Sequence, residues 1–205
     1  MTATKHAAAD TRVWQRMLSG RRLDLIDPSP LDIEIADIAH GLARVARWNG
    51  QTSGAHIFSV AQHTLLVEAV MRAQTPRIDE KLRLAALLHD APEYVIGDMI
   101  SPFKAVLGSG YRAIEMRLLA ATFLRFGLPP QPPQELRGLI KTADRAAAYL
   151  EATRLAGFST AEAKRLFDPP RLGAKGLERY LAPLGPALAE EGFLRRFAEL
   201  DEDAR

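Results

Sequence analysis

An apolar run that ends abruptly in two polar residues constrains the fold of this chain more than any other feature. Residues 82–88 read Leu-Arg-Leu-Ala-Ala-Leu-Leu, and His89 and Asp90 follow at once. Such a run is typical of a buried helix, where an imidazole beside a carboxylate is costly unless both find partners. Both side chains are also metal ligands. The sequence therefore predicts a helix that ends at a site, and the other members of that site must come from elsewhere in the chain.

Apolar residues at three-and-four spacing predict helices along almost the whole chain. Ser59 and Gln62 match a capping box, and Asp79 is suited to cap the helix that ends at His89. Only residues 23–27 read as a short extended piece, and residues 1–10 read as a loose terminus. The helices are expected at 35–48 (Arg47 and Trp48 in the last turn), 60–71, 80–90, 111–126, 135–156, 160–167, 175–181 and 186–200. The expected architecture is a single all-α helical bundle over 11–205, with at most a minor strand near the N-terminus.

The composition excludes several classes of function. The 27 Lys and Arg residues nearly balance 25 Asp and Glu residues, which leaves a net charge of +2. The basic residues are scattered, so we expect no nucleic-acid polymer as a partner, although a small anion is compatible. With no cysteine, any metal would be held by nitrogen and oxygen ligands. Neither a membrane span nor a signal peptide is recognisable, and we expect a cytoplasmic protein.

Four residues fit the needs of a divalent metal held without cysteine, namely His63, His89, Asp90 and Asp144. They fall on three separate predicted helices, each inside or at the end of an apolar face. Each residue taken alone also has an ordinary explanation: a histidine in a first or last helical turn, or an aspartate paired with Arg145. Only their joint occurrence distinguishes a metal site from ordinary packing.

The order and spacing of several short motifs resemble the HD-domain metal-dependent phosphohydrolase superfamily, most closely its bacterial 5'-deoxynucleotidase branch. The motifs are Ser-Val-Ala-Gln-His at 59–63, Leu-His-Asp-Ala-Pro-Glu at 88–93, Gly-Asp at 97–98, Pro102 with Lys104, and Lys-Thr-Ala-Asp at 141–144. The similarity covers a motif-bearing core from about residue 23 to residue 154. The expected helices at 160–200 carry no motif of the superfamily.

The resemblance implies an HD-domain helical bundle in which His63, His89, Asp90 and Asp144 hold one divalent metal ion. Two imidazole nitrogens and two carboxylates suit Mn, Co, Fe, Zn or Mg and do not choose among them. The expected reaction is removal of the phosphate from nucleoside 5'-monophosphates, with deoxyribonucleotides favoured, by attack of a metal-bound water.

The resemblance also assigns roles around the metal. Glu93 would orient or deprotonate the attacking water, and Asp98 would protonate the leaving 5'-oxygen. Arg47 would bind the phosphate through its forked guanidinium, while Trp48 would crowd the 2' position of the sugar. Two weaker candidates for substrate binding follow from position alone, and they are Lys104 and His56.

Gln62 departs from the deoxynucleotidase pattern, which most often has Glu beside the first histidine. The capping box accounts for Gln62 structurally, and we expect an uncharged neighbour to alter the tuning of His63. The departure bears on the substrate range more than on metal binding. Homodimers are common among the related proteins, and the apolar helical surface is compatible with one.

Two other functions remain open at this point. One is hydrolysis of a signalling nucleotide, such as an alarmone or a cyclic nucleotide. Alarmone hydrolases, however, carry an acidic residue where this chain has Tyr94, and two-metal phosphodiesterases need more histidines than His6, His40 and His56 supply. The other is a non-catalytic HD domain that binds a nucleotide or a partner protein. Such a domain should have lost ligands, whereas this sequence keeps them.

Overall fold

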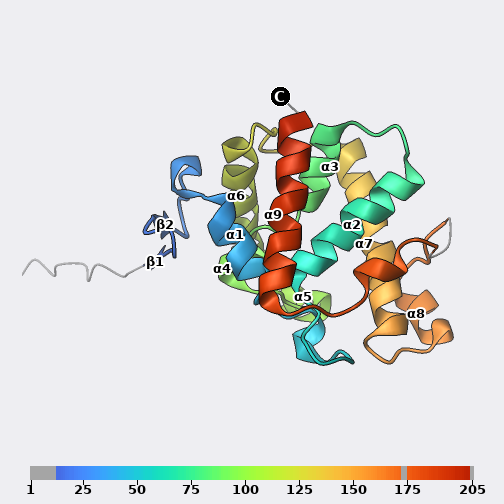
Figure 1. Ribbon diagram of the computed structural model, residues 1–205. Coiled ribbons are helices and arrows are strands. Elements are labelled where there is room, and N and C mark those ends of the chain that lie inside the picture. Colours follow the sequence, from blue (N-terminus) through green and yellow to red (C-terminus); the bar gives the residue numbers. More distant parts are fainter. Residues whose placement is uncertain (1–12, 172–174, 204–205) are drawn as a thin grey trace, which may run out of the picture.

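The computed structural model is an all-α protein with one small sheet, and it describes residues 13–171 and 175–203 (Figure 1). The loose terminus expected at 1–10 lies outside the described residues. In chain order the elements are β1 (Trp14–Arg16), β2 (Arg22–Asp24), η1 (Pro30–Asp32), α1 (Ile35–Leu42), η2 (Arg47–Gly50), α2 (Val60–Gln74), α3 (Glu80–Leu87), α4 (Glu93–Ile96), α5 (Ser101–Leu107), α6 (Ser109–Arg125), α7 (Gln134–Arg154), α8 (Thr160–Leu166), η3 (Glu178–Tyr180) and α9 (Pro186–Asp203). Among the described residues, no helix is long and apolar enough to cross a membrane.

Side-chain caps fix where two helices of the site begin. The Ser59 hydroxyl accepts the backbone N–H of Gln62 at the start of α2, and the Asp79 carboxylate accepts that of Lys81 at the start of α3. Each such cap is worth about 1 kcal/mol because it satisfies a backbone donor that the helix leaves free. Both predicted starts are confirmed, and α3 gives way to a turn at Leu88, so His89 and Asp90 follow its end as expected.

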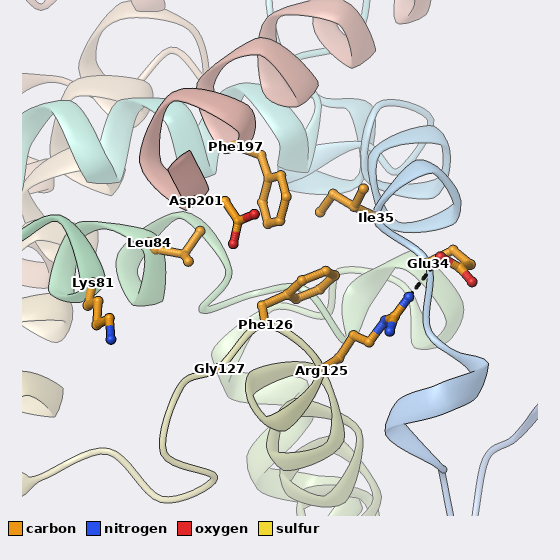
Figure 2. A pocket seen from close by; sticks show the side chains of 9 residues that line it. All are labelled: Glu34, Ile35, Lys81, Leu84, Arg125, Phe126, Gly127, Phe197 and Asp201. Atoms are coloured by element: carbon orange, nitrogen blue, oxygen red, sulfur yellow. Dashed lines mark hydrogen bonds and ion pairs between the residues drawn. The ribbon is translucent and has the colours of Figure 1, made fainter. Parts of the chain in front are cut away.

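A cavity of about 620 Å³ opens between the N-terminus of α1, the start of α3 and the ends of α6 and α9 (Figure 2). Its apolar wall includes Phe126 and Phe197, whose ring centroids lie 4.9 Å apart. At its rim Arg125 pairs with Glu34 over 3.2 Å. This ion pair neutralises the charges of Arg125 and Glu34.

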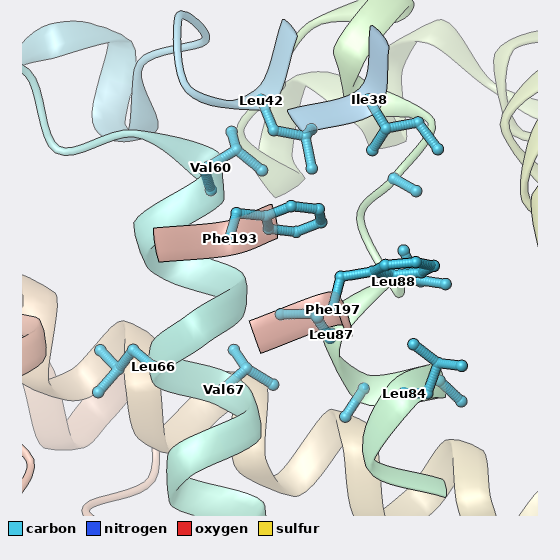
Figure 3. Packing of buried hydrophobic residues seen from close by; sticks show 14 of the residues in the cluster. Ile38, Leu42, Val60, Leu66, Val67, Leu84, Leu87, Leu88, Phe193 and Phe197 are labelled. Carbon is cyan, nitrogen blue, oxygen red and sulfur yellow. The ribbon is translucent and has the colours of Figure 1, made fainter. Parts of the chain in front are cut away.

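The core lies where α9 packs against α1, α2 and α3 (Figure 3). Phe193 is fully buried, and Phe197 lies beside it toward α3. Leu42 of α1, Val60 of α2 and Leu87 of α3 are also fully buried. Burial of each such side chain contributes about 1.5–3 kcal/mol. The helix without motifs, α9, therefore supports the three elements that carry or precede the predicted site.

The structure corrects three expectations about secondary structure. The helix expected to reach Trp48 ends at Leu42, because a backbone bridge between Ala46 and Ser59 draws the chain away toward the start of α2. Of the helix expected at 175–181, the structure shows only a 3₁₀ turn at 178–180. The extended piece expected at 23–27 is shorter, at Arg22–Asp24, and it pairs with β1, which the sequence analysis did not predict.

Candidate metal centre

Three of the four predicted ligands converge on one point. His63 comes from the first turn of α2, while His89 and Asp90 follow the end of α3. One ligand atom from each lies within 4.8 Å of the other two, as a shared metal ion requires. Asp90 Oδ2 is 3.3 Å from His89 Nε2 and 3.5 Å from His63 Nε2. The convergence predicted from the sequence is therefore present in the fold.

Asp144 approaches the same point from α7. Its Oδ1 atom lies 3.2 Å from His63 Nε2, so the carboxylate faces the ring nitrogen that also faces Asp90. The Asp144 side chain is 38% exposed, which leaves the site accessible from this side. The structure thus brings all four predicted ligands together around His63.

Hydrogen bonds at Nδ1 orient both imidazole rings so that Nε2 faces the candidate metal position. His89 Nδ1 lies 2.8 Å from the carbonyl oxygen of Ala86, and His63 Nδ1 lies 2.5 Å from Glu151 Oε1. In each case Nδ1 can donate a proton to its oxygen partner, so the neutral form of the ring has its lone pair on Nε2. Both Nε2 atoms are buried and have no hydrogen-bond partner among the described residues. Unsatisfied buried nitrogens of this kind fit a divalent cation bound by nitrogen and oxygen.

Glu151 is a member of the site that the sequence analysis missed. It is fully buried on α7, and besides His63 it contacts Arg47 and Trp48, two of the four predicted substrate-binding residues. Its Oε2 atom accepts a hydrogen bond from the indole N–H of Trp48 at 2.8 Å. The same oxygen accepts one from the Nε–H of Arg47 at 3.4 Å. A single carboxylate therefore joins the candidate metal ligand to the candidate phosphate-binding pair.

The charges of the site shift the pKa values of its members. Burial alone would raise the pKa of Glu151. The positive charges of His63 and Arg47 have the opposite and larger effect, and they lower this pKa to about 2. Burial and Arg47 lower the pKa of His63, whereas Glu151, Asp144 and Asp90 raise it more, so the net shift is well upward. Burial raises the pKa of Asp90, yet His89 and His63 bring it below its usual range. Without a metal the His63 ring therefore tends to carry a second proton, which a cation bound at Nε2 would displace.

The Gln62 side chain makes no hydrogen bond to His63 among the described residues. It does not return to Ser59 to complete the capping box either, and instead it bonds the segment before α9. Gln62 Nε2 donates to the carbonyl of Ala182 at 2.8 Å, and Gln62 Oε1 accepts the N–H of Leu184 at 3.0 Å. An amide can satisfy a carbonyl and an N–H together, whereas a carboxylate cannot. The carboxylate that orients His63 is Glu151, 88 residues along the chain.

Glu93 lies in the first turn of α4 and is almost completely buried. Lys104 Nζ is 3.2 Å from its Oε1 atom, while Oε2 has no partner among the described residues. Burial and the negative charges of Asp90 and Asp98 raise its pKa to about 9, because they outweigh the nearby ammonium. Lys104, a weaker candidate for substrate binding, lies on α5 and also pairs with Glu115.

Glu93→Gln is expected to lower turnover by about 10²–10⁴-fold, the usual contribution of a general base. The same change should stabilise the metal-free protein by about 1–3 kcal/mol at pH 9, because it removes a buried charge. A carboxyl whose pKa is raised on folding stabilises the fold at low pH, and that contribution disappears as the pH rises toward about 9. The advantage of the variant should therefore grow between pH 5 and pH 9, as measured by urea unfolding.

Glu115→Gln is the matched control, because it removes the other carboxylate partner of Lys104 without touching Glu93. We expect this variant to keep its turnover. A Glu93→Gln protein with normal turnover would contradict the catalytic role of Glu93.

Arg47 and Trp48 lie in the turn η2 between α1 and α2, and the structure places both against the site. Arg47 Nη1 donates to Asp98 Oδ2 over 2.9 Å, so the candidate phosphate binder and the candidate proton donor are in direct contact. Trp48 has φ 56° and ψ 29°, a left-handed backbone that is rare for a bulky residue. Its ring packs against Phe158 and Phe167, with ring centroids at 5.6 and 5.7 Å, and these two rings also contact each other. Strain of about 1–3 kcal/mol at such a residue is typical of functional sites.

His56 is the one predicted site residue that the described structure does not bring to the centre. It is exposed, and its ring lies close to Gly185, at the turn before α9. The large cavity of Figure 2 is not the candidate centre either, because none of the predicted ligands lines it. The chemistry of the donor atoms identifies the site here, and the size of a cavity does not.

Comparisons with known proteins find similarity over the part of the chain that contains the candidate site residues. A family model described as YfbR-like 5'-deoxynucleotidase matches residues 38–162, which include every candidate site residue from Arg47 to Glu151. An uncharacterized protein of Rhodobacter capsulatus is 62% identical over 159 residues, which are 78% of this chain and 81% of that relative. The uncharacterized Escherichia coli protein YfdR is 31% identical over 172 residues, which are 83% of this chain and 86% of its own.

Proposed function

We propose, because the chain belongs to the YfbR-like 5'-deoxynucleotidase family of HD-type hydrolases, that it removes the phosphate from nucleoside 5'-monophosphates and prefers deoxyribonucleotides. The observation that carries the proposal is the pair of buried Nε2 atoms, on His63 and His89, that face Asp90 without a partner. A divalent cation held there with Asp144 would supply Lewis acidity, which polarises a phosphoryl oxygen and acidifies water.

The side chains around the candidate ligands bind the phosphate, activate the water and protonate the leaving group. Arg47 offers a guanidinium already aligned by Asp98 and Glu151, and its free N–H groups bind the phosphate oxygens. The raised pKa of Glu93 would fall beside a bound cation, and the ionised carboxylate would then orient the attacking water through Oε2 and accept its proton. Asp98, in its protonated form, delivers a proton to the leaving 5'-oxygen beside the same guanidinium. These positions put the acid and the base on separate side chains.

The preference for deoxyribose depends on Trp48 in this proposal. Its ring is held by Phe158, by Phe167 and by the hydrogen bond to Glu151, so it presents a fixed edge to the sugar. Trp48→Ala should reduce the discrimination between deoxyribo- and ribonucleotides by about tenfold, which corresponds to about 1.4 kcal/mol. The measurement is the ratio of kcat/KM for dAMP and AMP. Unchanged discrimination would remove Trp48 from the specificity role.

The test of the activity is phosphate release from a panel of ribo- and deoxynucleoside mono-, di- and triphosphates. The protein is first freed of metal and then supplied with Mn, Co, Fe, Zn or Mg in turn. We expect monophosphates to react and triphosphates not to react. If no cation restores release while nucleotides still bind, the chain is a non-catalytic binding module. Release from an alarmone or a cyclic nucleotide alone would favour a signalling hydrolase.

A further inference from the structure

A groove separate from both the candidate metal centre and the cavity of Figure 2 lies along α2. This groove, of about 460 Å³, runs between α2 and α9, and the segment that follows η3 closes one end. Its walls include Leu65 from α2 and Leu188 from α9, which gives it an apolar part. The volume is in the range of pockets that bind small molecules. Neither the four candidate ligands nor Arg47 contributes to it.

Arginines dominate the polar lining of the groove. Four of them face it, Arg72, Arg179, Arg195 and Arg196, against one carboxylate, Glu199. That carboxylate is already engaged, because Glu199 lies 2.5 Å from Arg196, which also pairs with Glu68. The groove therefore has an excess of positive charge.

The other three arginines have little or no carboxylate compensation. Arg195 is 3.9 Å from Glu191, and both side chains are 69% exposed, so this pair contributes little. Arg72 and Arg179 have no ion pair in the part of the chain that the structure describes. Three guanidinium groups thus remain able to bind an anion in the groove.

An aromatic ring lies beside these charges. The Arg179 guanidinium donates to the Tyr180 hydroxyl at 3.0 Å, and its carbon lies 4.9 Å from the ring centroid. Tyr180 also lines the groove. A phosphate binds guanidinium groups in a forked geometry, while a base or another flat group packs against an aromatic ring. The two recognition elements occur here side by side.

Gly192 lines the floor of the groove from the interior of α9. Glycine there costs about 1 kcal/mol relative to alanine. Packing does not demand it, since a Cβ atom at this position would meet only the side chain of Leu65 at an ordinary 3.7 Å. What the missing side chain does provide is open space in the groove.

We propose that this groove binds a phosphorylated anion of mononucleotide size, at a site separate from the candidate metal centre. The arginines bind the phosphate, and Tyr180 with the apolar wall holds the rest of the ligand. Gln62 lines the groove, bonds the segment 182–184 and directly precedes His63. The ligand therefore lies one residue away from a candidate metal ligand, along the same helix.

The test is calorimetric titration of the full-length, metal-free protein with adenosine 5'-monophosphate. The metal is removed by dialysis against a chelator and then against chelator-free buffer. Arg72→Ala/Arg179→Ala should weaken binding by at least about tenfold, because two charge-assisted contacts are lost. The double variant Arg112→Ala/Arg117→Ala on α6 is the matched control, since it removes two exposed charges outside the groove. It should bind as the wild type does.

Further titrations separate the groove from the metal centre and define the ligand. Arg47→Ala should keep the binding, whereas loss with Arg47→Ala and retention in the groove variant would overturn the proposal. Adenosine should not bind, and inorganic phosphate should bind more weakly than the nucleotide. Equal binding of adenosine would exclude the phosphate contact, and equal binding of phosphate would exclude a nucleotide-sized ligand. A single-stranded oligonucleotide that binds more tightly would indicate a polymer site instead. The groove variants should keep normal phosphate release, so this proposal and the proposed function fail independently.

Discussion

His89→Ala and Asp90→Ala are each expected to abolish metal retention and to lower phosphate release by about 10³-fold or more. The reason is that, in the proposed function, the cation would contribute several kcal/mol to stabilising the charge that develops on the phosphate. Each substitution removes one of the mutually close ligand atoms, which lie within 4.8 Å of one another. The measurements are metal content per chain after dialysis and the rate of phosphate release at saturating metal.

His40→Ala is the matched control for this pair. His40 lies on α1, 3.4 Å from Glu190, and it contacts none of the candidate ligands. We expect this variant to retain metal and activity. If His89→Ala retained a full equivalent of metal and normal turnover, the candidate centre would be wrong, whatever the fate of the other site residues.

Substitutions of Glu151 should have the second largest effects on metal affinity and stability. The Gln and Ala variants distinguish loss of the negative charge from loss of the whole side chain. Glu151→Gln keeps the size of the side chain, but it removes the carboxylate that orients His63 and faces Arg47. Loss of such a partner to a metal-binding histidine usually weakens metal affinity by about 10–100-fold. Glu151→Ala leaves Arg47 and Trp48 without their buried acceptor as well, which should destabilise the fold by about 3–5 kcal/mol.

Two readouts distinguish an orienting role for Glu151 from a purely structural one. Metal titration measures the affinity of folded Glu151→Gln protein, and urea unfolding measures its stability separately. Glu135→Gln, at the exposed start of the same helix α7, is the matched control and should change neither. A Glu151→Gln protein that is less stable but binds metal as tightly as the wild type would contradict the orienting role.

The sequence, with the family motifs, was sufficient to predict which candidate ligands converge. His89 and Asp90 interrupt an apolar run at its end, and the caps Ser59 and Asp79 defined where the neighbouring helices begin. These are local signals, because a cap or a broken apolar face is recognisable within a few residues. Asp144 could be included because of the family motif that it ends. The described structure brings all four candidate ligands together around His63.

Glu151 escaped prediction because its partner His63 is 88 residues away. A signal was nevertheless present. Glu151 is seven residues after Asp144, so two turns of α7 put both on one helix face, the face that also carries the buried Ala147. A glutamate on a buried stripe needs a partner, and that requirement could have marked it as a site residue.

The turn that carries Arg47 and Trp48 was beyond what periodicity can show. The apolar spacing continues past Leu42 to Val45, and it predicts a helix that runs on. The chain leaves the helix because long-range contacts outweigh this local preference. Among them are the backbone bridge between Ala46 and Ser59 and the bond from the Trp48 indole to Glu151. Tertiary contacts of this kind routinely override helix propensity.

Because α9 is part of the hydrophobic core, the smallest fragment expected to fold must include it. All the family motifs end by Asp144, and Glu151 completes the site, yet Phe193 and Leu200 of α9 are fully buried against the earlier helices. A chain cut after residue 154 would keep every candidate site residue and lose the helix that covers α1, α2 and α3. It would expose an apolar surface and should aggregate or unfold. The active unit therefore extends beyond the motifs, to the far end of α9.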